Sequence, residues 1–174
     1  VKLCQESNLQ IQQFLFSVNH RDSLLINLKN TEIFQTVFLE LKNRIFMQNY
    51  EKFAEFLHHT DDYGDNFLYS YLTFFKFTQM KEIFSTLKSQ LMKKTLRSLI
   101  LQKDLLNCTF VHKIIECTSL FDNFEMLFEE IIQLFDNKNE LLDCLSQKTV
   151  DRKSIVHMAV PKGQKFLECI LKNL

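Results

Sequence analysis

Residues 154–163 read SIVHMAVPKG, and further apolar residues follow at helical spacing, namely Phe166, Leu167, Ile170 and Leu171. The spacing of the apolar positions on both sides of Gly163 predicts two short helices, each with one apolar face. Glycine readily adopts the positive φ that a turn between antiparallel helices favours. This stretch therefore predicts a helix, a turn at Gly163 and a second helix.

Earlier parts of the chain repeat the opening of this pattern. Residues 109–115 read TFVHKII, residues 61–69 read DDYGDNFLY, and a fainter copy has one helix over 31–44 and another over 49–58. Each of the three clear copies opens with a hydroxyl or amide side chain, which is Ser154, Thr109 or Asn66. A ring with a polar atom follows three residues later, in His157, His112 or Tyr69. A Thr-x-x-His pair at a helix start can tie the preceding turn by hydrogen bonds to backbone groups.

The stretch at 154–163 resembles an ankyrin repeat, whose pattern is Thr-Pro-Leu-His-x-Ala-Ala-x-x-Gly followed by an apolar second helix. Ser154 takes the Thr position, His157 the His position and Ala159 the first Ala position. Both glycines of the chain, Gly163 and Gly64, stand where the ankyrin pattern has Gly. The resemblance implies that Ala159 is buried where paired helices approach closely.

The spacing of the copies departs from the ankyrin family. From Tyr69 to His112 is 43 residues and from His112 to His157 is 45 residues, against about 33 in the family. The segment 87–100 supplies the extra length, with apolar residues at helical spacing that predict an elongated or added helix.

Together these patterns predict an all-α fold, with short antiparallel helix pairs stacked as an ankyrin-like repeat array whose repeats are longer than usual. The expected organisation is one domain over 1–174, with N-terminal capping helices in 1–27 and about four repeats in 28–174.

Composition agrees with a helical globular domain. Apolar residues make up 46% and charged residues 24%, while the chain has two Gly and one Pro, too few for a fold rich in hairpins. Helix starts are further predicted where Asn precedes an early Glu. These pairs are Asn30/Glu32, Asn49/Glu51, Asn123/Glu125 and Asn139/Glu140.

Charge is balanced overall and uneven locally. There are 21 basic and 21 acidic residues, so no global attraction to nucleic acid or an anionic membrane is implied. Residues 85–103 hold five bases and no acid, whereas residues 122–143 hold seven acids and one base. Two interpretations stay open: solvated helix faces, or steering of a partner of complementary charge.

The cysteines and the hydropathy bear on location. Five cysteines without a CxxC pair or a framework spacing favour a reducing compartment, the cytoplasm or the nucleus. No apolar run approaches the roughly 20 residues of a membrane span, so no membrane association is expected.

Two clusters invite a metal hypothesis. Cys108, His112 and Cys117 lack a fourth ligand, and His112 already has a role in the repeat pattern. The second cluster, His58, His59, Asp61 and Asp62, is typical of a helix end that runs into a polar turn. No nucleophile elbow, phosphate loop, kinase, zincin or redox motif occurs. We therefore expect no metal, no cofactor and no enzyme activity.

The resemblance implies a non-enzymatic protein-interaction module that acts as scaffold, inhibitor or recruitment adaptor. Partner contacts are expected on the turns before the helix pairs, at Tyr63, Asp65 and Arg152. A second candidate surface is the basic helix, with Lys93, Lys94 and Arg97. Three alternatives stay open: Tyr63 packs on its own repeat, the basic segment 88–103 binds nucleic acid or an acidic surface, or the chain associates with itself through its many Phe.

Overall fold

The computed structural model describes residues 31–46, 49–74, 77–118 and 121–173, and this part of the chain is built from helices. In chain order the helices are α2 (Thr31–Glu40), the π-helical η1 (Leu41–Ile45), α3 (Tyr50–Leu57), α4 (Phe67–Phe74), α5 (Phe77–Gln90), α6 (Lys93–Leu101), α7 (Phe110–Cys117), α8 (Phe121–Ile132), α9 (Lys138–Ser146), α10 (Ile155–Ala159), the 3₁₀-helical η2 (Val160–Lys162) and α11 (Gln164–Leu171). The described ranges contain no strand and only two isolated bridges, Thr60 with Asn66 and Lys148 with Ser154. The prediction of an all-α fold is confirmed.

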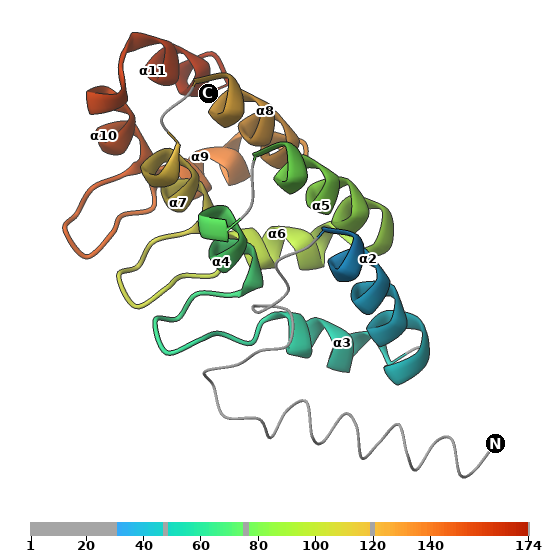
Figure 1. Cartoon of the computed structure of the whole chain (residues 1–174). Helices are drawn as coiled ribbons and strands as arrows, with labels where there is room; N and C mark the ends of the chain where they lie inside the picture. The colour runs from blue at the N-terminus through green and yellow to red at the C-terminus, as the bar shows by residue number, and fades with distance from the viewer. Residues whose placement is uncertain (1–30, 47–48, 75–76, 119–120, 174) are drawn as a thin grey trace.

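α-Helices whose labels differ by three pack side by side. In one row α4 contacts α7 and α7 contacts α10, while in the other α2 contacts α5, α5 contacts α8 and α8 contacts α11. Figure 1 shows the two rows running together along the molecule, with the α3–α4, α6–α7 and α9–α10 loops projecting from one side. Successive loops are thereby brought next to one another.

Aromatic rings join one helix to the next inside this stack. Phe110 of α7 is fully buried, and its ring centroid lies 5.7 Å from that of Tyr69 and 5.6 Å from that of Phe84. Phe124 of α8 lies 5.1 Å from Phe166 of α11 by the same measure. Rings at these separations add to the free energy of apolar burial. Part of the Phe-rich composition thus forms the core between adjacent helices.

The predicted helix starts are confirmed at two places. His112 lies at the third position of α7 and His157 at the third position of α10, behind Thr109 and Ser154 as N-caps. Ala159 of α10 is fully buried, as predicted. The helices α7 and α10 also contact each other directly.

The extra segment follows the second of its two predicted forms, an added helix. Leu87 lies in the last turn of α5, and a break at Leu91 and Met92 separates α5 from α6. Met92 has an extended backbone, with φ −62° and ψ 140°, so the α5 helix cannot continue through it. The segment 87–100 is therefore the end of one helix followed by a separate, added one.

The Asn signals locate helix starts with mixed accuracy. Asn49 caps α3 by accepting a hydrogen bond from the Lys52 N–H at 3.1 Å, as predicted. The prediction at Asn139 is wrong by two residues, because Asn137 is the cap of α9, and the one at Asn123 is wrong because that residue lies inside α8. Asn30 and the expected capping helices in 1–27 lie outside the described residues.

Candidate functional site

The three projecting loops share one local fold. We name them loop 1 (58–66), loop 2 (102–109) and loop 3 (147–154). One residue opens the turn in each loop: its N–H donates to the carbonyl four residues later and its carbonyl accepts from the N–H three residues later. Its side-chain oxygen also accepts from the N–H four residues later, at 3.0, 2.7 and 3.3 Å in loops 1, 2 and 3. These opening residues are Asp61, Asp104 and Thr149.

The fourth position of each turn has positive φ. Gly64 has φ +79°, Asn107 has φ +57° and Arg152 has φ +61°. The structure therefore explains why a glycine signal is present in loop 1 and absent from loop 2, since Asn adopts this region more readily than most side chains. A methyl group on Gly64 would also lie 2.9 Å from the Leu105 nitrogen, so loop 2 packs tightly against loop 1.

Backbone hydrogen bonds join the loop tips to each other. The Leu105 N–H donates to the Tyr63 carbonyl at 3.0 Å, and the Val150 N–H donates to the Leu106 carbonyl at 2.9 Å. All four tip residues are large, apolar and exposed, at 75% for Tyr63, 70% for Leu105, 55% for Leu106 and 52% for Val150. We name these four residues the loop-tip ridge. The alternative in which Tyr63 packs on its own repeat is wrong, because its side chain is mostly exposed.

His112 fastens loop 2 to the following loop. Its Nδ1 accepts from the Thr109 N–H at 3.2 Å, so the ring proton is on Nε2, which donates to the Gln147 carbonyl at 3.2 Å. Burial lowers the pKa of His112 below its ordinary value. The ring is therefore neutral near pH 7 and holds α7 to the end of α9.

Loop 1 has a matching contact to loop 2. The Tyr69 hydroxyl donates to the Gln102 carbonyl, as His112 does to Gln147 one loop later. The Asn66 amide donates to the Leu99 carbonyl at 3.0 Å. The sequence motif residues therefore have structural roles, since they hold the loops in a fixed order beneath the loop-tip ridge.

A partly buried ionic cluster lies under loops 1 and 2. The Lys113 Nζ lies 2.8 Å from Asp104 Oδ2 and 3.6 Å from Asp65 Oδ1. The carboxylate of Asp104 is stabilised, because its other oxygen accepts hydrogen bonds from the Leu106 and Cys108 N–H groups. The carboxylate form of Asp65 is destabilised, because the effect of burial exceeds the attraction to Lys113 and raises the pKa of Asp65 to about 6. Asp65, which the sequence predicts as a partner contact, instead faces Lys113 of the same chain.

The substitution Asp65→Asn is expected to stabilise the fold above pH 7 by about 1 to 2 kcal/mol. The folded chain binds the Asp65 proton more tightly than the unfolded chain does, because the folded-state pKa is raised to about 6. Stability contributed by this group is therefore present below the unfolded pKa and is lost as the pH rises through about 6. Denaturant unfolding at pH 4.5 and pH 8 measures the difference.

Asp104→Asn is the matched control in the same cluster. Its side chain is only 2% exposed, pairs closely with Lys113 and accepts two backbone hydrogen bonds, so this change should destabilise the fold. Equal effects of the two substitutions at pH 8 would contradict the different roles assigned to the two carboxylates.

The basic segment is paired with acids of the same chain. Lys88 lies 2.6 Å from Glu130, while Arg97 lies 3.1 Å from Asp136 and 2.5 Å from Glu140. Lys93 lies 2.5 Å from Asp136. The uneven charge seen in the sequence thus corresponds to ion pairs between segments about 40 residues apart. Lys94 is exposed, whereas Lys93 and Arg97 have partners within the fold.

The metal candidates have other partners. Both ring nitrogens of His112 are hydrogen-bonded, Cys108 is buried and Cys117 is exposed. The His58 ring contacts the Ala54 carbonyl at 2.7 Å and the Ser98 hydroxyl at 2.8 Å. Within the described part of the chain, no group of three or more His, Cys, Asp or Glu side chains is arranged to hold a metal ion.

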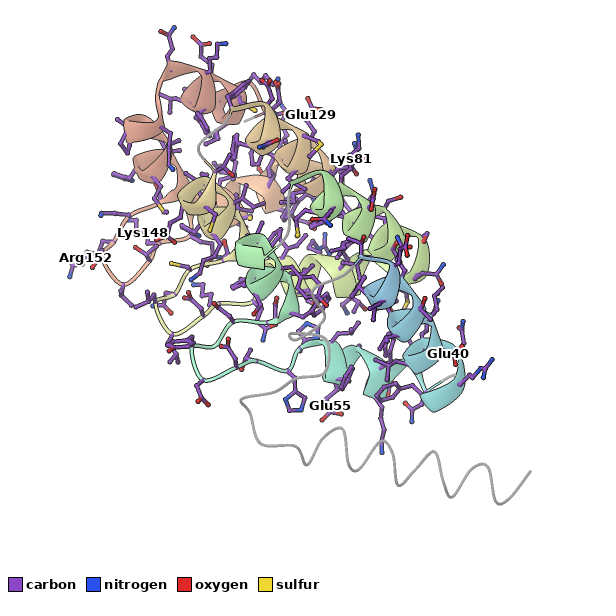
Figure 2. All side chains as sticks on the ribbon, viewed as in Figure 1. Glu40, Glu55, Lys81, Glu129, Lys148 and Arg152 are labelled. Atoms are coloured by element: carbon purple, nitrogen blue, oxygen red, sulfur yellow. The ribbon has the colours of Figure 1, made fainter. Side chains whose placement is uncertain are left out.

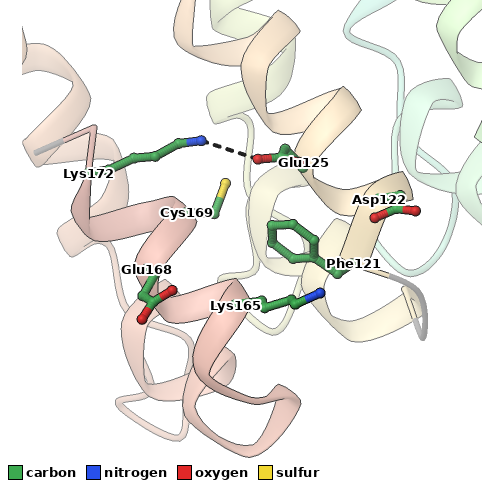
Figure 3. Close-up of a pocket in the computed structure, with 7 residues that line it drawn as sticks. All are labelled: Phe121, Asp122, Glu125, Lys165, Glu168, Cys169 and Lys172. Carbon is green, nitrogen blue, oxygen red and sulfur yellow. Dashed lines mark hydrogen bonds and ion pairs between the residues drawn. The ribbon is translucent and has the colours of Figure 1, made fainter.

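A hollow between α8 and α11 also brings chemical groups close together (Figure 3). Phe121, Asp122, Glu125, Lys165, Glu168, Cys169 and Lys172 line it. The Lys172 ammonium pairs with Glu125 at 3.1 Å. Burial raises the pKa of the Cys169 thiol to about 11, so this thiol is protonated near pH 7 and is a poor nucleophile.

Comparison of the chain with protein-family models, with curated proteins and with solved structures finds no match. Among the described helices, none is long and apolar enough to span a bilayer.

Sequence reasoning missed most of the loop-tip ridge. It singled out Tyr63 and Arg152, which lie on exposed loops as expected, but not Leu105, Leu106 or Val150. An aliphatic pair is ordinarily assigned to the core. Their exposure could have been predicted from their position, because Leu105 and Leu106 lie a few residues before the copy of the motif at 109–115, where the pattern requires a turn.

Proposed function

We propose that this chain is a non-enzymatic protein-interaction module, a scaffold, inhibitor or recruitment adaptor, whose contact surface is the loop-tip ridge. The observation that carries the proposal is that backbone hydrogen bonds between successive loops bring together four residues whose apolar side chains are exposed. Isolated exposed apolar residues are common on proteins, whereas a contiguous apolar group on the surface is typical of an interaction site.

The loops are preorganised for binding. Each is closed by its own backbone and side-chain hydrogen bonds, and His112 and Asn66 tie the loop bases to neighbouring carbonyls. A surface that is already ordered loses little conformational entropy on binding. Tyr63 adds a large aromatic anchor, the type of residue that dominates many protein interfaces.

We further propose that the helices form an ankyrin-like array with units of 43 to 45 residues, each ending in an added helix such as α6 or α9. The recurrence of the loop turn, the N-cap motif and the row-to-row contacts supports this arrangement. A reducing compartment, the cytoplasm or the nucleus, suits the free thiols of Cys108, Cys117, Cys144 and Cys169.

The alternative function, binding of nucleic acid or an acidic surface through segment 88–103, has weaker support. Lys88, Lys93 and Arg97 already pair with acids of the chain, and a phosphate would have to displace those carboxylates. Self-association through Phe side chains is also less favoured, because no Phe is among the exposed large apolar residues in the part of the chain whose side-chain burial is described.

Ridge substitution tests the proposal. The double variant Leu105→Ser, Leu106→Ser should retain specific protein partners at least tenfold less than the unchanged chain, because truncation of central apolar contacts removes much of the binding energy. Quantitative mass spectrometry of proteins retained from nuclease-treated extract measures this loss.

The control is Met92→Ser, Leu142→Ser, which removes exposed apolar side chains of 58% and 50% exposure outside the three loops. Its retained proteins should equal those of the unchanged chain. Equal retention by the ridge variant and the control would refute the assigned surface, and loss of all retained material on nuclease treatment would favour nucleic acid.

A further inference from the structure

Charge changes sign along the loop-tip ridge. Loop 1 carries the exposed Asp62 beside Tyr63, over the acidic pair Asp61 and Asp65. Loop 3 carries three exposed basic side chains, Lys148, Arg152 and Lys153, with one exposed acid, Asp151. The ridge therefore has an acidic end and a basic end.

The basic end is not neutralised within the fold. Among the described residues, none of the ion pairs involves Lys148, Arg152 or Lys153. Figure 2 shows Lys148 and Arg152 on the projecting loop, far from Lys81 and Glu129 of the helical rows. Their arrangement differs from that of Arg97 on α6, which contacts two carboxylates.

The apolar contact and the basic groups are adjacent in loop 3. Val150 lies two residues after Lys148 and two residues before Arg152. A partner side chain packed on Val150 is therefore close to both cations. An acidic residue next to an apolar one in the partner would satisfy both features at once, whereas a basic residue there would be repelled.

We propose that the ridge binds a segment of another protein in which apolar residues are accompanied by Asp or Glu, with the carboxylates over loop 3. This inference rests on the proposed function and adds the chemistry and direction of the bound segment. The apolar side chains of the segment pack on Tyr63, Leu105, Leu106 and Val150, and its carboxylates are attracted to Lys148, Arg152 and Lys153. Charge complementarity thus sets the orientation on an apolar ridge that has no direction of its own.

A nucleic acid fits this surface less well. Phosphates would meet the three cations of loop 3, whereas the other end of the ridge lies beside the acidic residues of loop 1. The ridge also presents three aliphatic side chains and one aromatic ring, whereas surfaces that bind single strands place several aromatic rings beside basic groups.

Selection from a library of random displayed peptides tests the inference on the whole chain. Peptides enriched on the unchanged protein should contain apolar residues next to Asp or Glu. A synthetic copy of the most enriched peptide should bind about tenfold more weakly to Lys148→Glu, Arg152→Glu, Lys153→Glu, because several exposed attractions become repulsions. Selection on that variant should instead enrich Lys and Arg.

The matched control is Lys52→Glu, Lys81→Glu, Lys94→Glu, which changes the net charge equally at exposed positions outside the loops. It should bind the same peptide within twofold. Enrichment of basic or uncharged peptides, equal weakening in the control, or no enrichment would each overturn the inference. If partner capture still depends on Leu105 and Leu106 in that event, the interaction function stands and only the partner's chemistry is wrong.

Discussion

Replacement of His112 by Ala is expected to lower the free energy of unfolding by about 3 kcal/mol. The ring is fully buried, accepts from the Thr109 N–H and donates to the Gln147 carbonyl. The substitution would leave the Thr109 N–H at the start of α7 without its His112 acceptor, leave the Gln147 carbonyl without this donor and open a cavity. Denaturant unfolding followed by circular dichroism measures the change.

His157→Ala supplies the matched comparison. His157 occupies the same position of the N-cap motif in α10 and contacts Ser154 in the same way, but it is exposed and, among the described residues, donates to no carbonyl of another loop. We expect a loss of about 1 kcal/mol, the contribution of a helix cap. Losses of equal size at both positions would contradict a role for His112 between successive loops.

The substitution Gly64→Ala is expected to destabilise the fold by about 3 kcal/mol, for two reasons that add. Its φ of +79° costs an L-residue roughly 1 to 2 kcal/mol. The new methyl group would also lie 2.9 Å from the Leu105 nitrogen and 3.1 Å from the Asp104 Cα, so the backbone of loop 2 would have to move. Thermal and denaturant unfolding report the loss.

Asn107→Gly is the control for this position. Asn107 stands at the same place in the turn of loop 2, with φ +57°, and glycine adopts that conformation without strain. The free energy of unfolding should change by less than about 0.5 kcal/mol. A Gly64→Ala protein as stable as the unchanged chain would show that loops 1 and 2 are not in close contact.

The sequence predicted the parts of the fold that depend on local chemistry. The N-cap and His pairs at Thr109/His112 and Ser154/His157 define helix starts through hydrogen bonds three residues apart. Such contacts depend on neighbouring residues alone, so a motif reports them directly. The turn at loop 1 was predictable for the same reason, because Gly64 marks its positive φ.

Features that depend on stacking were not predictable. Arg97 pairs with Glu140 across 43 residues, and the sequence showed only that one segment is basic and another acidic. The ridge was hidden for a related reason. Leu105 and Leu106 are aliphatic residues of the type usually found in a core, and only the three-dimensional path of loop 2 exposes them.

Site-specific photocrosslinking tests the proposed interaction surface most directly. A photoreactive amino acid at position 106 of the loop-tip ridge is compared, in cells that express the chain, with the same amino acid at position 142 of α9, which is similarly exposed. We predict that light produces discrete protein adducts from position 106 that are absent from position 142. Adducts of equal yield at both positions, or adducts at position 142 alone, would contradict the assignment of the ridge as the contact surface.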